Sequence, residues 1–208
     1  MASISKSDVF TIAADPNTDI WKKPPAHNVF TAPYKTHSKH ATTAFRSASL
    51  TFNAPYHHQY DQAGFLLIFH PPSQPAHAPA ALSHRKWIKA GVEVFNGAPS
   101  LSVVGCDSWA DWSVADVPPA AAAAPLTMRI EREVEASGSC LWIHHVRRQE
   151  STGQEVKVPL RQLCWPYGEA AGDGWMLEVA AAVARPSKTT TDSLCATFCD
   201  FDVEWHHE

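Results

Sequence analysis

Along most of the chain, apolar and polar residues alternate over short segments rich in Trp, Phe, Val and Ile, and Gly, Pro, Asn and Asp separate these segments. This pattern is typical of many strands and few helices, and it predicts a two-sheet sandwich or jelly roll. Only Met176–Arg185 is ambiguous between strand and helix. The predicted strands are Phe45–Phe52, Ala63–Phe69, Lys86–Asn96, Leu101–Asp107, Leu126–Glu135, Cys140–Arg147, Val156–Tyr167, Gly174–Ala184 and Leu194–Trp205.

The segment Lys86–Asn96, KWIKAGVEVFN, has two distinct faces if it is a strand. Its first face is an uninterrupted apolar set that predicts burial between the sheets: Ile88, Ala90, Val92 and Val94. Its second face carries an aromatic, a cation, a glycine and an anion in order: Trp87, Lys89, Gly91 and Glu93, followed by Phe95.

Two interpretations of that second face stay open. Lys89 and Glu93 lie about 13 Å apart along a strand, so they do not pair directly but can bracket a small polar ligand over Gly91. Alternatively, the face is solvated or salt-bridged to neighbouring strands, and Gly91 makes room for a neighbouring aromatic ring.

The polar triplet Tyr60, Asp61 and Gln62 leads into Ala63–Phe69, which is apolar on both faces, as a central strand should be. These three residues can line a pocket at the end of the strand. They can also form a turn in which Asp61 caps backbone N–H groups. The sequence favours the capping role for Asp61.

Composition limits the possible functions. The chain has 208 residues, a formal net charge of −4 and 45% hydrophobic residues, which suit one domain, residues 1–208, with a sizeable core. The acidic balance argues against a nucleic-acid partner, and the apolar runs are too short for a membrane span. Pro/Ala-rich stretches at 70–83 and 117–125 are expected to be surface loops.

Five cysteines and an N-terminal region without a secretory pattern predict reduced thiols and a cytoplasmic location. No CxxC pair or carboxylate cluster suits zinc or calcium, so no metal or other cofactor is expected. The cysteines are Cys106, Cys140, Cys164, Cys195 and Cys199.

The segment WADWS provides two indoles, Trp109 and Trp112, beside the carboxylate of Asp111. Such a group suits stacking and hydrogen bonding on a sugar-like ring, although a packed corner is the alternative. In PLRQLCW, Arg161 and Trp165 lie on the same face of the predicted strand. Arg161 can bind an anion beside this tryptophan, or it can pair with Glu93 or Asp111 across strands.

Candidate catalytic groups are Glu93, Lys89 and His144, one of two adjacent histidines in a predicted strand, of which at most one faces the ligand side. Glycoside hydrolysis needs two carboxyl groups about 5–9.5 Å apart. Glu93 has no partner two residues away in its strand, so Glu178 or Asp61 would have to supply the second carboxyl group.

Seven motifs, in the order in which they occur along the chain, resemble those of the fungal regulation-of-enolase protein family. That family is part of a broader domain of unknown function with a concanavalin A-like lectin/glucanase jelly roll. The resemblance runs from about Thr11 to Trp205, and the Pro/Ala-rich stretches depart from it. It implies two antiparallel sheets, a ligand on the concave face and a cytoplasmic location. The motifs are TDIWKKPP (18–25), FTAP (30–33), QYDQAG (59–64), KWIKAGVEVFNG (86–97), WADWS (109–113), LWIHHV (141–146) and PLRQLCW (159–165).

Three functional hypotheses follow. The first is an intracellular protein that binds a small polar or carbohydrate-like metabolite on the concave sheet face and regulates sugar metabolism. The second is an enzyme on the same face: an isomerase, lyase, cyclase or glycoside hydrolase. The third is a protein-interaction module that acts on enolase, as the family name implies.

Overall fold

The computed structural model describes residues 8–72, 85–118, 124–149 and 152–206. Short 3-10 segments lie at Thr42–Ala44, Trp165–Tyr167 and Glu169–Ala171. The strands are β1 (Phe10–Ala14), β2 (Ile20–Lys23), β3 (His27–Phe30), β4 (Tyr34–Ala41), β5 (Phe45–Asn53), β6 (Gln62–His70), β7 (Lys86–Phe95), β8 (Ala98–Cys106), β9 (Ala110–Asp116), β10 (Leu126–Glu135), β11 (Gly138–Arg148), β12 (Glu155–Leu163), β13 (Met176–Ala184) and β14 (Leu194–Trp205).

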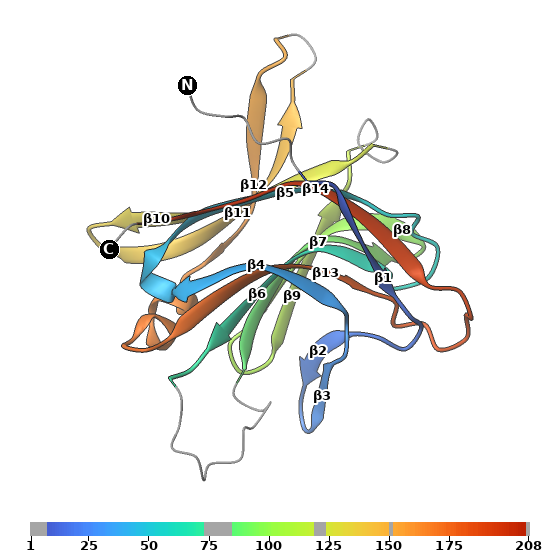
Figure 1. Ribbon diagram of the computed structural model, residues 1–208, viewed down its shortest axis with the longest axis horizontal. Helices are drawn as coiled ribbons and strands as arrows, with labels where there is room; N and C mark the ends of the chain where they lie inside the picture. Colours follow the sequence, from blue (N-terminus) through green and yellow to red (C-terminus); the bar gives the residue numbers. More distant parts are fainter. Residues whose placement is uncertain (1–7, 73–84, 119–123, 150–151, 207–208) are drawn as a thin grey trace.

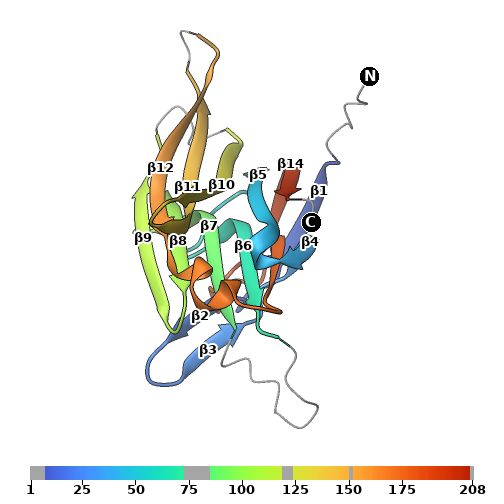
Figure 2. The same cartoon turned by 90° about the vertical axis from the view of Figure 1, so that its left-hand side faces the viewer.

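Two six-stranded antiparallel sheets pack face to face (Figure 1). The terminal sheet, which holds the first and last strands, has the order β1-β14-β5-β10-β11-β12. The second has the order β4-β13-β6-β7-β8-β9, and we call it the hairpin sheet because the β2–β3 hairpin lies on its outer side (Figure 2). The chain crosses repeatedly between the sheets, which confirms the predicted all-β jelly-roll sandwich.

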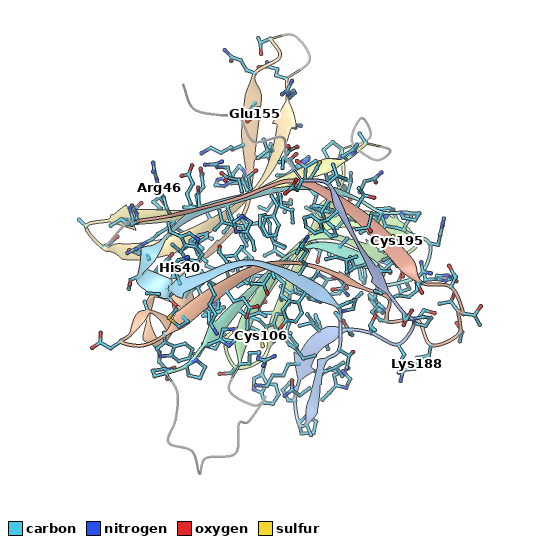
Figure 3. The ribbon with its side chains drawn as sticks, in the orientation of Figure 1. His40, Arg46, Cys106, Glu155, Lys188 and Cys195 are labelled. Atoms are coloured by element: carbon cyan, nitrogen blue, oxygen red, sulfur yellow. The ribbon has the colours of Figure 1, made fainter. Side chains whose placement is uncertain are left out.

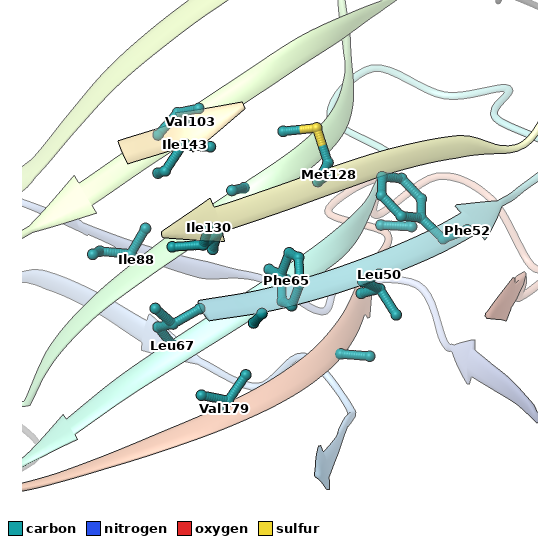
Figure 4. Packing of buried hydrophobic residues seen from close by; sticks show 14 of the residues in the cluster. Leu50, Phe52, Phe65, Leu67, Ile88, Val103, Met128, Ile130, Ile143 and Val179 are labelled. Carbon is teal, nitrogen blue, oxygen red and sulfur yellow. The ribbon is translucent and has the colours of Figure 1, made fainter. Parts of the chain in front are cut away.

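The core lies between the two sheets because each strand turns alternate apolar side chains inward (Figure 4). Phe65 and Leu67 of β6 lie on one side of this layer, and Leu50 of β5 and Met128 of β10 lie on the other; all four are buried. Burial of this apolar layer from both sides is the main favourable term for the fold.

All nine predicted strands are present, with ends that differ by a few residues. The ambiguous segment Met176–Arg185 contains strand β13, which pairs with β4 and β6 and is buried on both faces over most of its length. One correction concerns Val156–Tyr167: its strand ends at Leu163, and the segment Trp165–Tyr167 forms a 3-10 turn with Pro166 near its start.

The outer face of the hairpin sheet carries a second apolar cluster beneath the β2–β3 hairpin. Buried Ile68, Trp87 and Cys106 of the sheet belong to this cluster together with Ile20 of the hairpin. Cys106 is labelled on this side of the sheet in Figure 3. The hairpin therefore gives this sheet an inner and an outer buried layer.

The Pro/Ala-rich stretches 70–83 and 117–125 lie mostly outside the described residues. Within the described part of the chain, no helix has the length and apolar character needed to cross a membrane.

Candidate functional site

Strand β7 turns its two faces as the sequence predicts. Ile88, Ala90 and Val92 belong to the core between the sheets. Lys89 and Glu93 point to the outer side, where both are buried at 9% and 5% exposure. Two ionisable side chains are thus held out of water on one strand.

A pair of glycines separates Lys89 from Glu93. Gly91 lies opposite Gly64 of β6. A Cβ atom on Gly91 would lie 2.1 Å from the carbonyl oxygen of Ala63, and one on Gly64 would lie 2.4 Å from that of Ala90. Close approach of the two backbones, rather than a neighbouring aromatic ring, therefore requires glycine at both positions. The approach leaves the outer face without side chains between the two charged groups.

Lys89 lies among polar and aromatic groups. Its Nζ donates a hydrogen bond of 2.5 Å to Oε1 of Gln62 and lies 3.9 Å from Oδ1 of Asp19. The rings of Trp21 and Trp87 both have their centroids 5.7 Å from Nζ. Burial lowers the pKa of Lys89, although the nearby carboxyl groups act in the opposite direction.

Glu93 is held by a short relay of hydrogen bonds. The indole Nε1 of Trp112 donates to Oγ of Ser102 at 2.9 Å, and Oγ of Ser102 donates to Oε2 of Glu93 at 2.9 Å. Because an indole N–H can only donate, this contact leaves the serine proton free to bond the carboxyl group. Burial raises the pKa of Glu93, and Lys89 and Ser102 only partly offset that effect.

The β2–β3 hairpin contributes two further side chains to this site. Asp19 precedes β2, and its Oδ1 accepts hydrogen bonds from the backbone N–H of Ile20 at 2.7 Å and from Nε2 of Gln62 at 3.4 Å. Trp21 packs edge-on against Trp112, with ring centroids 5.9 Å apart. The hairpin is therefore a wall of the site.

Some of these groups line a cavity of about 20 Å³, which is room for about one water molecule. Its polar lining consists of Gln62, Lys89, Glu93 and Ser102, and small residues such as Ala182 complete it. The cavity offers hydrogen-bond donors and acceptors to one small chemical group.

Aromatic side chains form a rim beside this cavity. Trp112 contacts Phe95 at 4.9 Å and Tyr60 at 6.3 Å between ring centroids. Tyr60 is 41% exposed and can take part in a contact from solution. The structure thus brings together six of the predicted site residues: Lys89, Glu93, Trp87, Gln62, Tyr60 and Trp112.

Asp61 has a structural role instead. It is fully buried, and its carboxylate accepts hydrogen bonds from Arg185 and from the backbone N–H groups of His57 and His58. This is the capping role that the sequence favoured, and it corrects the alternative in which Asp61 lines the ligand site. The turn it forms fixes the start of β6 and hence the positions of Tyr60 and Gln62.

Asp111 and Arg161 pair with one another on the other side of edge strand β9. Nη2 of Arg161 donates to Oδ2 of Asp111 at 2.5 Å, and its Nη1 donates to the carbonyl of Val103 at 3.3 Å. Arg161 belongs to β12, so this contact links the two sheets. The prediction that these two residues line the ligand site is corrected, and the alternative pairing of Arg161 with Asp111 is found.

Trp109 lies just before β9 and is 42% exposed. Nζ of Lys22 lies 5.2 Å from the centroid of its ring. Trp109 therefore contacts the β2–β3 hairpin, but it is not among the residues that line the cavity.

His144 lies on the opposite side of the molecule. It belongs to β11 of the terminal sheet, and its Nδ1 is 3.8 Å from Oε2 of Glu131. Burial lowers its pKa. The structure corrects the prediction that His144 shares a face with Lys89 and Glu93. Glu178 is on the hairpin sheet, but it bonds to Nε2 of His70 at 2.7 Å and does not line the cavity.

Sequence reasoning missed Asp19, Trp21 and Ser102. The first two lie in the motif TDIWKKPP, to which no chemical role was assigned. Ser102 is a polar residue on an otherwise apolar stretch of β8, and this exception to the pattern was the available signal. Among the described residues, no group of three or more His, Cys, Asp or Glu side chains could hold a metal ion.

Comparisons with known proteins show what the whole chain is similar to. An uncharacterized protein of Emericella nidulans is 34% identical over 196 residues, which cover 94% of this chain and 86% of the relative. A functionally unknown protein from Saccharomyces cerevisiae has a similar structure, with 18% identity, a TM-score of 0.61 and full coverage of both chains. A GH16 protein of Bacteroides ovatus in complex with a G4G4G3G product is 9% identical, with a TM-score of 0.46 over 98% of this chain and 83% of that one.

The first two similar proteins carry no assigned activity, and the link to enolase stays a prediction. A family model described as "Protein of unknown function (DUF1349)" matches residues 1–201. This match covers nearly the whole chain, so the chain belongs to the DUF1349 family.

Proposed function

We propose that the protein binds a small polar, carbohydrate-like metabolite at the cavity between Lys89 and Glu93 on the outer face of the hairpin sheet. The observation that carries this proposal is a pair of buried ionisable side chains with unused hydrogen-bonding capacity beside a cavity. Buried charged groups in proteins are ordinarily paired and fully hydrogen-bonded.

The unused capacity is specific. An ammonium group can donate three hydrogen bonds, yet among the described residues the Lys89 ammonium makes one, to Gln62. The Glu93 carboxyl group likewise bonds only to Ser102 within the described part of the chain. Ligand hydroxyl groups both donate and accept, so they match a site that presents a donor on one wall and a carboxyl group on the other.

The aromatic rim supports a ring-shaped ligand. Tyr60 and Trp112 provide apolar ring surfaces next to the polar cavity, and a sugar ring has an apolar face with polar hydroxyl groups at its edges. Because the cavity has room for about one water molecule, only one substituent of the ligand enters it, and the remainder lies on the rim.

A cytoplasmic location is part of the proposal. It is supported by the five cysteines, all of which are free thiols. The proposal includes a role in regulating sugar metabolism, which requires that the ligand-loaded and ligand-free forms differ in their partners.

The proposal is tested by thermal denaturation of the full chain with a panel of neutral sugars, sugar acids and sugar phosphates. A compound present at 100 times its Kd adds about 2.7 kcal/mol to the free energy of unfolding. For a chain of this length, that is a rise in Tm of about 5–10 °C. Glu93→Gln and Lys89→Met are expected to abolish the rise.

Matched control variants come from the terminal sheet, where Glu131 and Lys157 form an ion pair on the outer face. Glu131→Gln and Lys157→Met remove the same charges and should keep the ligand-induced rise. The proposal is contradicted if no compound of the panel raises Tm, or if the rise survives both substitutions in the cavity.

A further inference from the structure

The amino group of Lys89 is buried, which favours its neutral form, and the side chain lines the cavity. The rings of Trp21 and Trp87 have their centroids 5.7 Å from Nζ, and the hydrogen bond to Gln62 fixes its position. Because ring faces attract the charged form, burial alone is what favours the neutral amine here. The lysine lines the same cavity as Glu93. Lys89 is therefore both buried and beside a cavity.

We propose that Lys89 is a nucleophile whose Nζ forms an imine with the carbonyl carbon of a small aldehyde or ketone, such as the open-chain form of a short sugar. The inference rests on the proposed function, because it places the carbonyl end of the ligand in the same cavity. It adds a covalent step and a ligand class that binding alone does not require.

The chemistry of buried lysines supports this proposal. Lysine attacks carbonyl groups only as the neutral amine, and desolvation in an apolar pocket is a known way to activate it. An exposed lysine with a pKa of about 10.4 is neutral in about one molecule in 2,500 at pH 7. The lowered pKa of Lys89 increases that fraction. The titratable groups that face Lys89 are Glu93, Asp19 and Cys106.

The step is balanced by the groups present. The Nζ electron pair forms the C–N bond while the carbonyl π pair moves to oxygen, which takes a proton from the Glu93 carboxyl group. The nitrogen passes one proton to Asp19, whose Oδ1 is 3.9 Å away. The resulting hydroxyl group then leaves as water with that proton, the C=N bond forms, and the iminium proton returns to Glu93. The sum is amine plus carbonyl compound giving imine plus water, with no oxidant or reductant.

The size of the cavity limits the ligand. Room for about one water molecule accommodates one non-hydrogen atom, the carbonyl oxygen, and no branched group. A terminal aldehyde therefore fits better than an internal ketone, and its hydroxylated chain extends toward Tyr60 and Trp112.

The test is reductive trapping with glycolaldehyde, a two-carbon hydroxyaldehyde, on the full chain. Sodium cyanoborohydride supplies the hydride that converts each imine to a stable amine, and peptide mass spectrometry gives the initial labelling rate of every lysine. At pH 7, Lys89 is expected to be labelled at least tenfold faster than the exposed Lys188 and Lys157. The ratio should fall as the pH approaches 10, where ordinary lysines also become neutral.

Three controls make the result decisive. In guanidinium chloride the ratio of Lys89 to Lys188 should fall to about one, because the folded site is lost. Glu93→Gln removes the proposed proton donor and should slow labelling of Lys89 about tenfold while leaving Lys188 unchanged. Far-UV circular dichroism of the variant shows whether it is folded. A ratio of one or less at pH 7 in the native protein overturns the proposal.

The failure of this proposal can be told apart from failure of the proposed function. If sugars raise Tm through Glu93 but Lys89 is labelled no faster than Lys188, non-covalent binding stands and the imine is excluded. If no sugar raises Tm but Lys89 is labelled selectively, the nucleophile stands and the binding of sugars is contradicted.

Discussion

Two clusters of buried charge lie on the hairpin sheet, and they are satisfied to very different degrees. The Asp61 carboxylate accepts hydrogen bonds from Nε and Nη2 of Arg185 at 3.0 and 2.9 Å, and from the backbone N–H groups of His57 and His58. Nη1 of Arg185 in turn donates to Asp192. Asp61 and Arg185 are therefore fully paired, and only Asp192 reaches solvent.

The cluster around Lys89 and Glu93 is also buried, but each of the two charged groups makes one hydrogen bond within the described part of the chain. A cavity lies where further partners would be. The comparison teaches that burial of charge by itself does not identify a site. Unused hydrogen-bonding capacity beside a cavity distinguishes a site from a structural ion pair.

The largest effect is expected from Asp61→Asn. This substitution removes the buried counter-charge of Arg185 and leaves it only the exposed Asp192, and breaking a buried ion pair from one side costs about 3–5 kcal/mol. Urea denaturation would measure the loss. Asp192→Asn, at the exposed end of the same arginine, should cost much less. Equal losses of free energy of unfolding in the two variants would show that the buried Asp61 stabilises Arg185 no more than the exposed Asp192 does.

An intermediate effect, dependent on pH, is expected for Glu93. The raised pKa means that the folded protein binds this proton more tightly than the unfolded chain does, whose pKa is about 4.3. The protonated form of Glu93 therefore contributes fully to the free energy of unfolding below about pH 4, and this contribution is lost as the pH rises through the pKa of the folded state.

The glutamine in Glu93→Gln does not titrate. The free energy of unfolding of this variant should therefore increase relative to that of the natural protein as the pH rises from about 4 to 8. Each unit of pKa shift corresponds to about 1.4 kcal/mol. Urea denaturation of both proteins across this range measures the difference. If the difference in free energy of unfolding is constant with pH, or changes in the opposite direction, then Glu93 is as well stabilised by its partners as Asp61 is.

The smallest effect is expected for Lys157→Met on the terminal sheet. Nζ of Lys157 lies 2.7 Å from Oε2 of Glu131, but the lysine side chain is 50% exposed. Exposed ion pairs contribute about 0–1 kcal/mol, so urea denaturation should show a change of less than about 1 kcal/mol. A larger loss would mean that the outer face of this sheet also depends on its charges.

Much of the fold was predictable because the strands of the core carry a local signal. In β7, alternate residues such as Ile88 and Val92 are apolar and face the core, and this period of two identifies both the strand and its outer face. Lys89 and Glu93 could therefore be selected from eleven residues of sequence. Strand β13 was ambiguous because apolar residues cover both of its faces.

The rest of the site depends on contacts that no local pattern records. Asp19 and Trp21 come from a hairpin whose strands have four residues each, too few for a clear period. Strand β4 is mostly exposed and polar, so it shows no apolar face. In β9, Trp112 and Asp111 are adjacent and point to opposite sides, and only the order of the strands tells which of them meets Lys89 or Arg161.

The pairing of the chain's two ends has a consequence for its synthesis. Strand β1 pairs with β14, and β13 lies between β4 and β6 in the hairpin sheet. A polypeptide leaving the ribosome from its N-terminus therefore holds β4 and β6 with unpaired edges until Met176–Ala184 emerges. The hairpin sheet is therefore completed only late in translation. A product that terminates before Met176 lacks the strand that joins β4 to β6.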